Sequence, residues 1–162
     1  MGRINDSVVQ EGPITYNPFT STIVKLPTRT VNMEIESRLP SKEGLTIETV
    51  ISILYKIKPT EAPEILRNVG RNYESEIILP VFRSSAADVT ARFLAKDLHS
   101  GERAVIETAI KEQMASIIES RGIIVEDVLM KSIKLPAGLT KTIEQKLQAE
   151  QDAQRLEFVK QQ

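Results

Sequence analysis

Residues 29–58 decide the fold, and they read RTVNMEIESRLPSKEGLTIETVISILYKIK. Apolar and polar residues alternate in both halves of this stretch, and the apolar set is Val31, Met33, Ile35, Leu39, Ile47, Ile51, Ile53, Tyr55 and Ile57. A period of two is typical of β-strands that bury one face. Residues 40–44 between the halves contain Pro40 and Gly44, which favour a turn, so the two strands are predicted to pair antiparallel. The apolar face of such a sheet needs a cover, and helices later in the chain are predicted to supply it.

The composition fits one globular domain and excludes several classes of function. The chain has 162 residues, of which 41% are hydrophobic and 27% are charged, as in ordinary folded proteins. It contains no cysteine, which excludes disulfides, thiolate metal ligands and cysteine nucleophiles. A net charge of -1 provides no overall field that attracts nucleic acid, so no nucleic-acid partner is predicted. No apolar run approaches the roughly 18 residues that span a bilayer, and the chain as given is predicted to be soluble.

The chain before residue 29 is predicted to form short strands joined by turns. Gly12-Pro13 and Asn17-Pro18 are turn-forming pairs, and short apolar groups lie around them. Phe19 falls at a turn rather than within a run. The preferred interpretation packs Phe19 on the sheet, and the alternative is an apolar tip that touches a membrane.

Beyond Lys58 the pattern changes to a helical period. A short helix is predicted with Thr60 as its cap, and a second helical region over residues 73–95 is predicted to kink or restart at Pro80. A longer helix is predicted over residues 102–121. Its inward side is expected to carry Ile106, Ile110, Met114 and Ile117.

A return strand and a last helix complete the predicted architecture. The apolar pattern of residues 123–135 shifts phase twice, which indicates β-bulges or strong twist. From Ala137 onward the chain becomes rich in Gln, Glu, Lys and Ala, with an apolar stripe formed by Leu139, Ile143 and Leu147. Nothing follows in the sequence to cover this stripe, so a partner chain is expected to cover it, as in a coiled coil; a frayed polar tail is the alternative. The predicted class is α+β, a twisted antiparallel sheet covered by helices, with a long C-terminal helix.

The residue chemistry favours no catalytic, cofactor or metal site. His99 is the only histidine, and Ser84, Ser85 and Ser100 lie in no nucleophile motif, so an acyl-transfer site is not predicted. One imidazole without a thiolate does not make a zinc site. Glu34 and Glu36 share one face of a strand, and we interpret them as solvated sheet surface rather than as a catalytic pair. A hydrolase centred on His99 remains an alternative.

The order of several short motifs resembles the stomatin/prohibitin/flotillin/HflK-C family, also called SPFH or band 7, and within it the prohibitin-like branch. The resemblance covers nearly all of residues 3–162. The motifs that carry it are Glu11-Gly12-Pro13, Asn17-Pro18-Phe19, Arg29-Thr30, Ser41-Lys42-Glu43-Gly44-Leu45, Tyr55-Lys56-Ile57, Gly70-Arg71-Asn72-Tyr73-Glu74, Leu79-Pro80, Arg121 to Val128, Ile133 to Pro136, Ile143-Glu144-Gln145-Lys146 and Ala149 to Arg155 with Phe158-Val159.

This resemblance implies a function that the periodicities do not. Family members are membrane-associated scaffolds that assemble into large rings or cages, and prohibitin-like members are linked to membrane microdomains and to ATP-dependent membrane proteases. The domain is not regarded as an enzyme. Residues 1–136 are expected to form the family's domain and residues 137–162 the start of its coiled-coil helix. The usual N-terminal anchor and the longer helix are missing, so we expect a truncated piece of a membrane-associated protein.

Two sets of contact residues follow from this hypothesis. Leu139, Ile143 and Leu147 are the predicted contact between subunits, in homo- or hetero-oligomers. Ile14, Tyr16 and Phe19 are the predicted membrane-facing edge, with lipids as partners. The alternative function is a monomeric module that binds a peptide or a lipid within a membrane protease complex.

Overall fold

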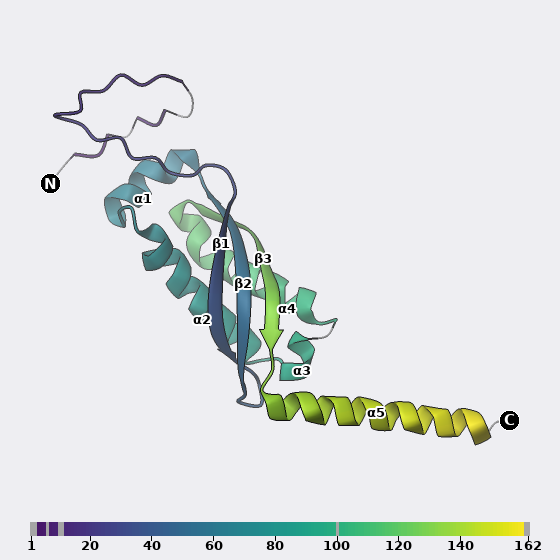
Figure 1. The fold of residues 1–162 in the computed structure, drawn as a ribbon. Helices are drawn as coiled ribbons and strands as arrows, with labels where there is room; N and C mark the ends of the chain where they lie inside the picture. Colours follow the sequence, from purple (N-terminus) through teal and green to yellow (C-terminus); the bar gives the residue numbers. More distant parts are fainter. Residues whose placement is uncertain (1–2, 6, 10–11, 100, 161–162) are drawn as a thin grey trace.

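Three antiparallel strands form a sheet in the order β1-β2-β3 (Figure 1). The computed structural model describes residues 3–5, 7–9, 12–99 and 101–160. β1 (Val31–Pro40) pairs with β2 (Thr46–Ile57) in an unbroken register from Val31 opposite Tyr55 to Pro40 opposite Thr46. Gly44 takes a φ of +79° in the turn between them, a conformation that glycine adopts without steric cost. The predicted antiparallel pair is confirmed.

β3 (Ile123–Lys134) returns along the other side of β2. Its register with β2 shifts twice, once between Val50 and Ile51 and once between Leu54 and Tyr55. Each shift lets the apolar residues of β3 change phase in the sequence while they stay on one face of the sheet. The predicted bulges are confirmed.

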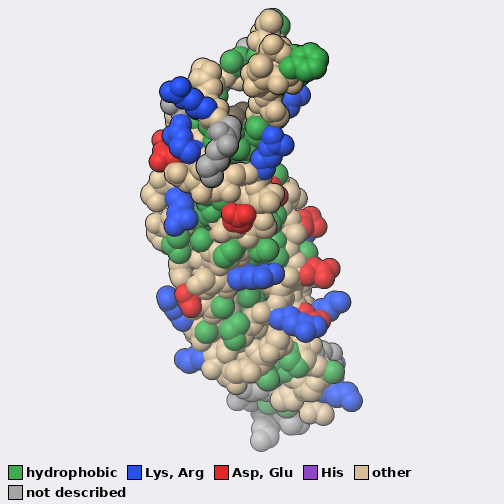
Figure 2. All heavy atoms as spheres, turned by 90° about the vertical axis from the view of Figure 1, so that its left-hand side faces the viewer, with side chains coloured by type: hydrophobic (Ala, Val, Ile, Leu, Met, Phe, Trp, Pro, Cys, Tyr) green, Lys and Arg blue, Asp and Glu red, His purple; other side chains and the backbone are tan. Residues whose placement is uncertain are grey.

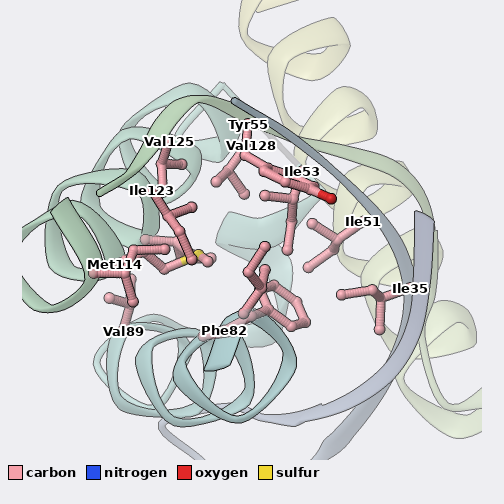
Figure 3. Close-up of a cluster of buried hydrophobic side chains, with 14 of the residues drawn as sticks. Ile35, Ile51, Ile53, Tyr55, Phe82, Val89, Met114, Ile123, Val125 and Val128 are labelled. Atoms are coloured by element: carbon pink, nitrogen blue, oxygen red, sulfur yellow. The ribbon is translucent and has the colours of Figure 1, made fainter. Parts of the chain in front are cut away.

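One face of the sheet carries the hydrophobic core, and the helices cover it (Figure 3). Phe82 and Val89 from α2 (Leu79–Thr90) and Met114 from α4 (Arg103–Ile118) meet strand residues such as Ile51, Ile53 and Val128. These side chains are at most 2% exposed. The predicted α+β class, a sheet with helices on its apolar face, is confirmed.

The shorter helices connect the sheet to this cover. A 3-10 turn at Pro59–Glu61 leads into α1 (Ala62–Asn68), and a π-helical turn at Glu74–Ile78 leads directly into α2. α3 (Ala95–Leu98) follows, and a second 3-10 turn at Glu119–Arg121 ends α4. The restart predicted at Pro80 is present, since Pro80 lies in the first turn of α2.

Two details of the helix predictions are wrong. Thr60 lies inside the 3-10 turn, so its backbone cannot take the extended conformation of a cap, and the residue before α1 is Glu61, without a side-chain cap. Ile117 is 40% exposed, whereas Ile118 is fully buried. The buried stripe of α4 continues in steps of four from Met114, and the sequence allowed a step of three equally well.

The N-terminal segment, which we define as residues 3–28, differs from its prediction. Its described residues contain a turn at residues 18–20 but no strand. Pro13, Pro18 and Pro27 each lack a backbone donor, and the apolar runs between them are too short to compete for a place in the sheet. Of the residues described in this segment, Leu26 is the one that packs against the core as a half-buried apolar residue.

α5 (Ala137–Lys160) leaves the body of the molecule as a single long helix. It starts two residues after β3 and extends away from the sheet, whereas the N-terminal segment lies beyond α1 at the other end of the sheet (Figure 1). The two chain ends therefore project from opposite ends of one body.

Candidate membrane-contact and assembly surfaces

The most buried polar cluster joins the sheet to the π-helical turn. The Tyr55 hydroxyl on β2 donates to the Glu74 carboxylate and lies 3.5 Å from the Tyr73 hydroxyl. The two tyrosine rings meet edge to face, with centroids 6.4 Å apart. Burial, and then the hydrogen bond to Glu74, raise the pKa of Tyr55, and burial raises the pKa of Tyr73. Both hydroxyls stay protonated at neutral pH, and the hydrogen bond between Tyr55 and Glu74 ties the turn before α2 to the sheet.

Sequence reasoning missed this cluster, although the position of one of its residues in the sequence indicated it. Tyr55 lies on the core face of its strand, and a buried tyrosine hydroxyl needs a hydrogen-bond partner. The pattern did not identify that partner, because Glu74 comes from a turn nineteen residues away.

The described residues considered for catalysis, His99, Ser84 and Ser85, form no side-chain hydrogen bonds with one another. His99 is exposed at the end of α3, and no described side chain forms a hydrogen bond with its imidazole. Ser84 is exposed, Ser85 is buried without a hydrogen-bond partner, and Ser100 lies outside the described residues. The described part of the chain also holds no group of three or more acidic or histidine residues placed to bind a metal ion.

The face of the sheet away from the helices is a charged surface. Glu34 forms an ion pair with Lys131, and Glu126 forms one with Lys56 across 2.7 Å. The hydrogen bond and the charge of Lys131 hold the pKa of Glu34 below its ordinary value. Glu36 is exposed, so Glu34 and Glu36 behave as separate surface carboxylates. We call this surface the open face.

One end of the open face is hollowed. The depression has a volume of about 360 Å³, and its lining includes Glu36, Arg38, Glu48 and Lys134. Arg38 and Glu48 neutralise each other through a contact of 3.1 Å. With both signs of charge in its lining, the depression selects no class of small ligand.

The predicted membrane-facing residues are exposed. Phe19 is 96% exposed, and Ile14 and Tyr16 are close to half exposed. The Asn17 side chain accepts a hydrogen bond from the Phe19 N–H (3.0 Å), and its carbonyl accepts one from Ser21 (2.9 Å), which fixes a turn with Phe19 at its tip. The preferred interpretation, in which Phe19 packs on the sheet, is wrong.

More apolar side chains share this exposure. The N-terminal segment holds most of the large exposed hydrophobic residues in the described chain, and they are Val8, Val9, Ile14, Tyr16, Phe19 and Ile23. In Figure 2 a hydrophobic side chain stands out at the end of the molecule that this segment occupies, with Lys and Arg side chains below it. Such a concentration is typical of contact surfaces, because single exposed apolar residues are normally scattered.

The predicted assembly residues lie on α5. Leu139 is half-buried and packs against the core at the start of the helix. The side chains of Ile143 and Leu147 lie outside the described residues. Beyond Leu139 every α5 side chain that the structure describes is exposed, among them Gln145, Gln148 and Arg155. As far as its side chains are described, α5 is therefore a projecting rod that packs against its own body in its first turn. No helix in the described ranges is both long and apolar enough to cross a bilayer.

Comparisons with known proteins agree on one family. The model of the SPFH domain / Band 7 family matches residues 1–162. Prohibitin-1 of Saccharomyces cerevisiae is 24% identical over 156 residues, which cover 96% of this chain and 54% of that protein. Prohibitin-1 of Schizosaccharomyces pombe is 25% identical over 159 residues, which cover 98% of this chain and 56% of that protein. Prohibitin 1 of Gallus gallus is 23% identical over 156 residues, which cover 96% of this chain and 57% of that protein. The chain thus spans just over half the length of these relatives.

Proposed function

Because the chain belongs to the SPFH domain / Band 7 family, we propose that it is a non-enzymatic scaffold domain that works at a membrane surface. The N-terminal segment contacts the bilayer through Ile14, Tyr16 and Phe19. α5 takes part in contacts between subunits through Leu139, Ile143 and Leu147. The assembled protein organises membrane microdomains or regulates an ATP-dependent membrane protease, as the family resemblance implies.

The observation that supports this proposal is the separation of the two surfaces. The exposed apolar tip lies at one end of the sheet and α5 leaves from the other (Figure 1). A subunit built in this way can touch a bilayer with one end while the other end stays free for its neighbours. Inserting an apolar side chain as large as Phe19 into the interface contributes roughly 1.5–3 kcal/mol, so three such residues support reversible binding.

Vesicle flotation tests the membrane contact. The vesicles contain phosphatidylcholine and phosphatidylglycerol in equal parts. The triple variant Ile14→Ser, Tyr16→Ser, Phe19→Ser should bind at least about tenfold more weakly than wild type, because most of the inserted apolar area is gone. The control is Val105→Ser on α4, which removes a side chain that is 53% exposed away from the tip. Equal binding of the triple variant and wild type would contradict the membrane assignment.

The protein-concentration dependence of the same binding tests assembly. Lateral association on the vesicle makes the binding curve steeper than a single-site curve. The variant Ile143→Lys, Leu147→Lys should lose this steepness and keep the binding at low protein concentration. Gln145→Lys with Gln148→Lys adds the same charge at exposed positions of α5 and is the control. A single-site curve for wild type would contradict the role of α5 in assembly.

A second candidate function, a peptide-binding module, has its own support. Within the described residues, the outer strands β1 and β3 each pair only with β2, and an open sheet edge is the feature that peptide-binding domains of the strand-addition type use.

A further inference from the structure

The two edges of the sheet are protected unequally, and β3 is the protected edge. The Met130 N–H donates to the Glu107 carboxylate of α4 across 2.6 Å. Glu107 is itself held by Arg103 across 3.2 Å, and the Val128 N–H donates to the Asp127 side chain across 2.9 Å. β3 also carries both register shifts. Side-chain acceptors, a covering helix and bulges are the means by which proteins stop an edge from pairing with another strand.

Within the described ranges, β1 has neither side-chain acceptors on its backbone nor register shifts. Among the described residues, every hydrogen bond to the backbone of β1 comes from its pairing with β2. The pairing is regular over all ten residues, and the only proline of β1 is its last residue, Pro40. Its core-side residues Met33 and Ile35 are apolar, so no inward charge discourages pairing. The outer backbone donors and acceptors of β1 are free to accept a further strand.

The surroundings of β1 have the form of a binding groove. α2 packs against β1 from the core face of the sheet, and its first turns lie beside β1 in Figure 1. Val31 and Met33 on β1 and Leu79 and Val81 on α2 are only partly buried against the core. Figure 2 looks onto this side and shows hydrophobic side chains exposed between charged ones. A strand placed beside β1 would rest its helix-side residues on this apolar floor.

The charges on the open face define the occupant. Glu34 and Glu36 are the central open-face residues of β1, and Glu36 forms no ion pair or hydrogen bond within the described chain. We propose that the β1 edge binds an extended peptide segment as a fourth strand, and that this segment alternates apolar residues with lysine or arginine. Its apolar residues face α2, and its basic residues face Glu36, which has no ion pair among the described residues, whereas Glu34 beside it is already paired with Lys131. A second copy of β1 is a poorer occupant because it would bring further glutamates to the same place.

This inference is independent of the membrane proposal, because strand addition and vesicle binding use different surfaces. Its probe is a synthetic peptide of alternating lysine and valine with a threonine at each end. We expect the peptide to bind and to shift the amide NMR signals of β1 and α2. A peptide of the same sequence, N-methylated on every second residue, cannot donate the edge hydrogen bonds and should not bind.

Charge reversal supplies the matched variants. Glu36→Lys should lower the affinity for the lysine–valine peptide about fivefold, since one exposed ion pair is lost and a like-charge contact replaces it. The Glu36 side chain forms no hydrogen bond or ion pair with the described residues, so the variant should fold normally. Glu112→Lys makes the same charge change on the exposed side of α4 and should leave the affinity unchanged.

Several results would overturn the proposal. Among them are equal binding of the N-methylated peptide, equal affinity of Glu36→Lys and wild type, and amide shifts located in α5 or the N-terminal segment. Sedimentation could show dimers that are joined through β1. If the peptide did not dissociate these dimers, the edge would be assigned to a second copy of the chain instead. Failure of vesicle binding would leave this proposal standing, because the probe binds in the absence of lipid.

Discussion

Two phenylalanines show how differently the body and the ends of this protein are built. Phe82 in α2 is fully buried, and Phe19 in the N-terminal segment is 96% exposed. The body, residues 31–134, arranges its apolar side chains on one sheet face and on the facing sides of α2 and α4. The ends leave apolar side chains exposed, and of their described residues only Leu26, Leu135 and Leu139 pack against the core.

The difference indicates a division of roles between stability and contact. A buried side chain such as Phe82 stabilises the fold because it leaves water on folding. The exposed side chain of Phe19 contributes nothing of this kind until it meets another surface. Substitutions in the body should therefore change the free energy of unfolding, whereas the equivalent substitutions in the ends should not. The predictions below test this contrast with pairs of the same residue type.

The phenylalanine pair should show the largest contrast. Phe82→Ala removes a fully buried ring and leaves a cavity, so we expect it to lower the free energy of unfolding by about 3–5 kcal/mol. Phe19→Ala should change it by no more than about 0.5 kcal/mol. Urea denaturation followed by circular dichroism measures both. A loss above that limit for Phe19→Ala would show that the tip packs on the body and would break the comparison.

The body could be predicted from the sequence because its signals are long and mutually consistent. The alternation in residues 29–58 extends over two strands, and a single register places its apolar set on the core face, with Val50 and Leu54 as exceptions on the open face. The phase shifts in β3 were visible as well, because a bulge moves every later residue of the pattern. Each helix facing the sheet showed a stripe that ends at a glycine or restarts at a proline.

The parts that could not be predicted depend on local competition or on distant contacts. Ile117 and Ile118 fit the stripe of α4 equally well, and only packing decides between them. Short apolar runs around Pro13 and Pro18 resemble strands, but no strand of the sheet pairs with them. The partner of Tyr55 comes from a π-helical turn, which has no recognisable sequence pattern. The exposure of Phe19 follows from the absence of a covering element, and a sequence pattern does not report such an absence.

A glycine pair gives the second contrast. Gly122 joins α4 to β3 with a φ of +84°, and a Cβ atom there would lie 2.3 Å from the Glu61 Cβ. Gly122→Ala should therefore cost about 2–4 kcal/mol, from the left-handed backbone and from the collision. Gly138 lies in the first turn of α5 with open space around it, so Gly138→Ala should leave the unfolding of the body unchanged. A rise of about 1 kcal/mol in the free energy of unfolding of the body for Gly138→Ala would mean that α5 and the body unfold as one unit, because alanine favours the helix over glycine.

A tyrosine pair gives the smallest contrast and adds a dependence on pH. Tyr55→Phe removes the donor to Glu74 and should cost about 1–2 kcal/mol at pH 7. Tyr16→Phe changes an exposed side chain and should cost nothing measurable. Urea denaturation at a series of pH values measures both variants against wild type.

The sign of the pH dependence follows from the protonation states. The folded protein holds the pKa of Tyr55 above its ordinary value near 10, so the folded state keeps a proton that the unfolded chain releases at high pH. Wild type should therefore lose stability as the pH rises above about 10, and part of that loss should be absent in Tyr55→Phe. The difference between the two proteins should narrow with rising pH, whereas Tyr16→Phe should follow wild type throughout. A difference in the free energy of unfolding that stays constant above pH 10 would mean that the Tyr55 hydroxyl ionises as readily in the folded body as an exposed tyrosine does. The contrast between body and ends would then not extend to this cluster.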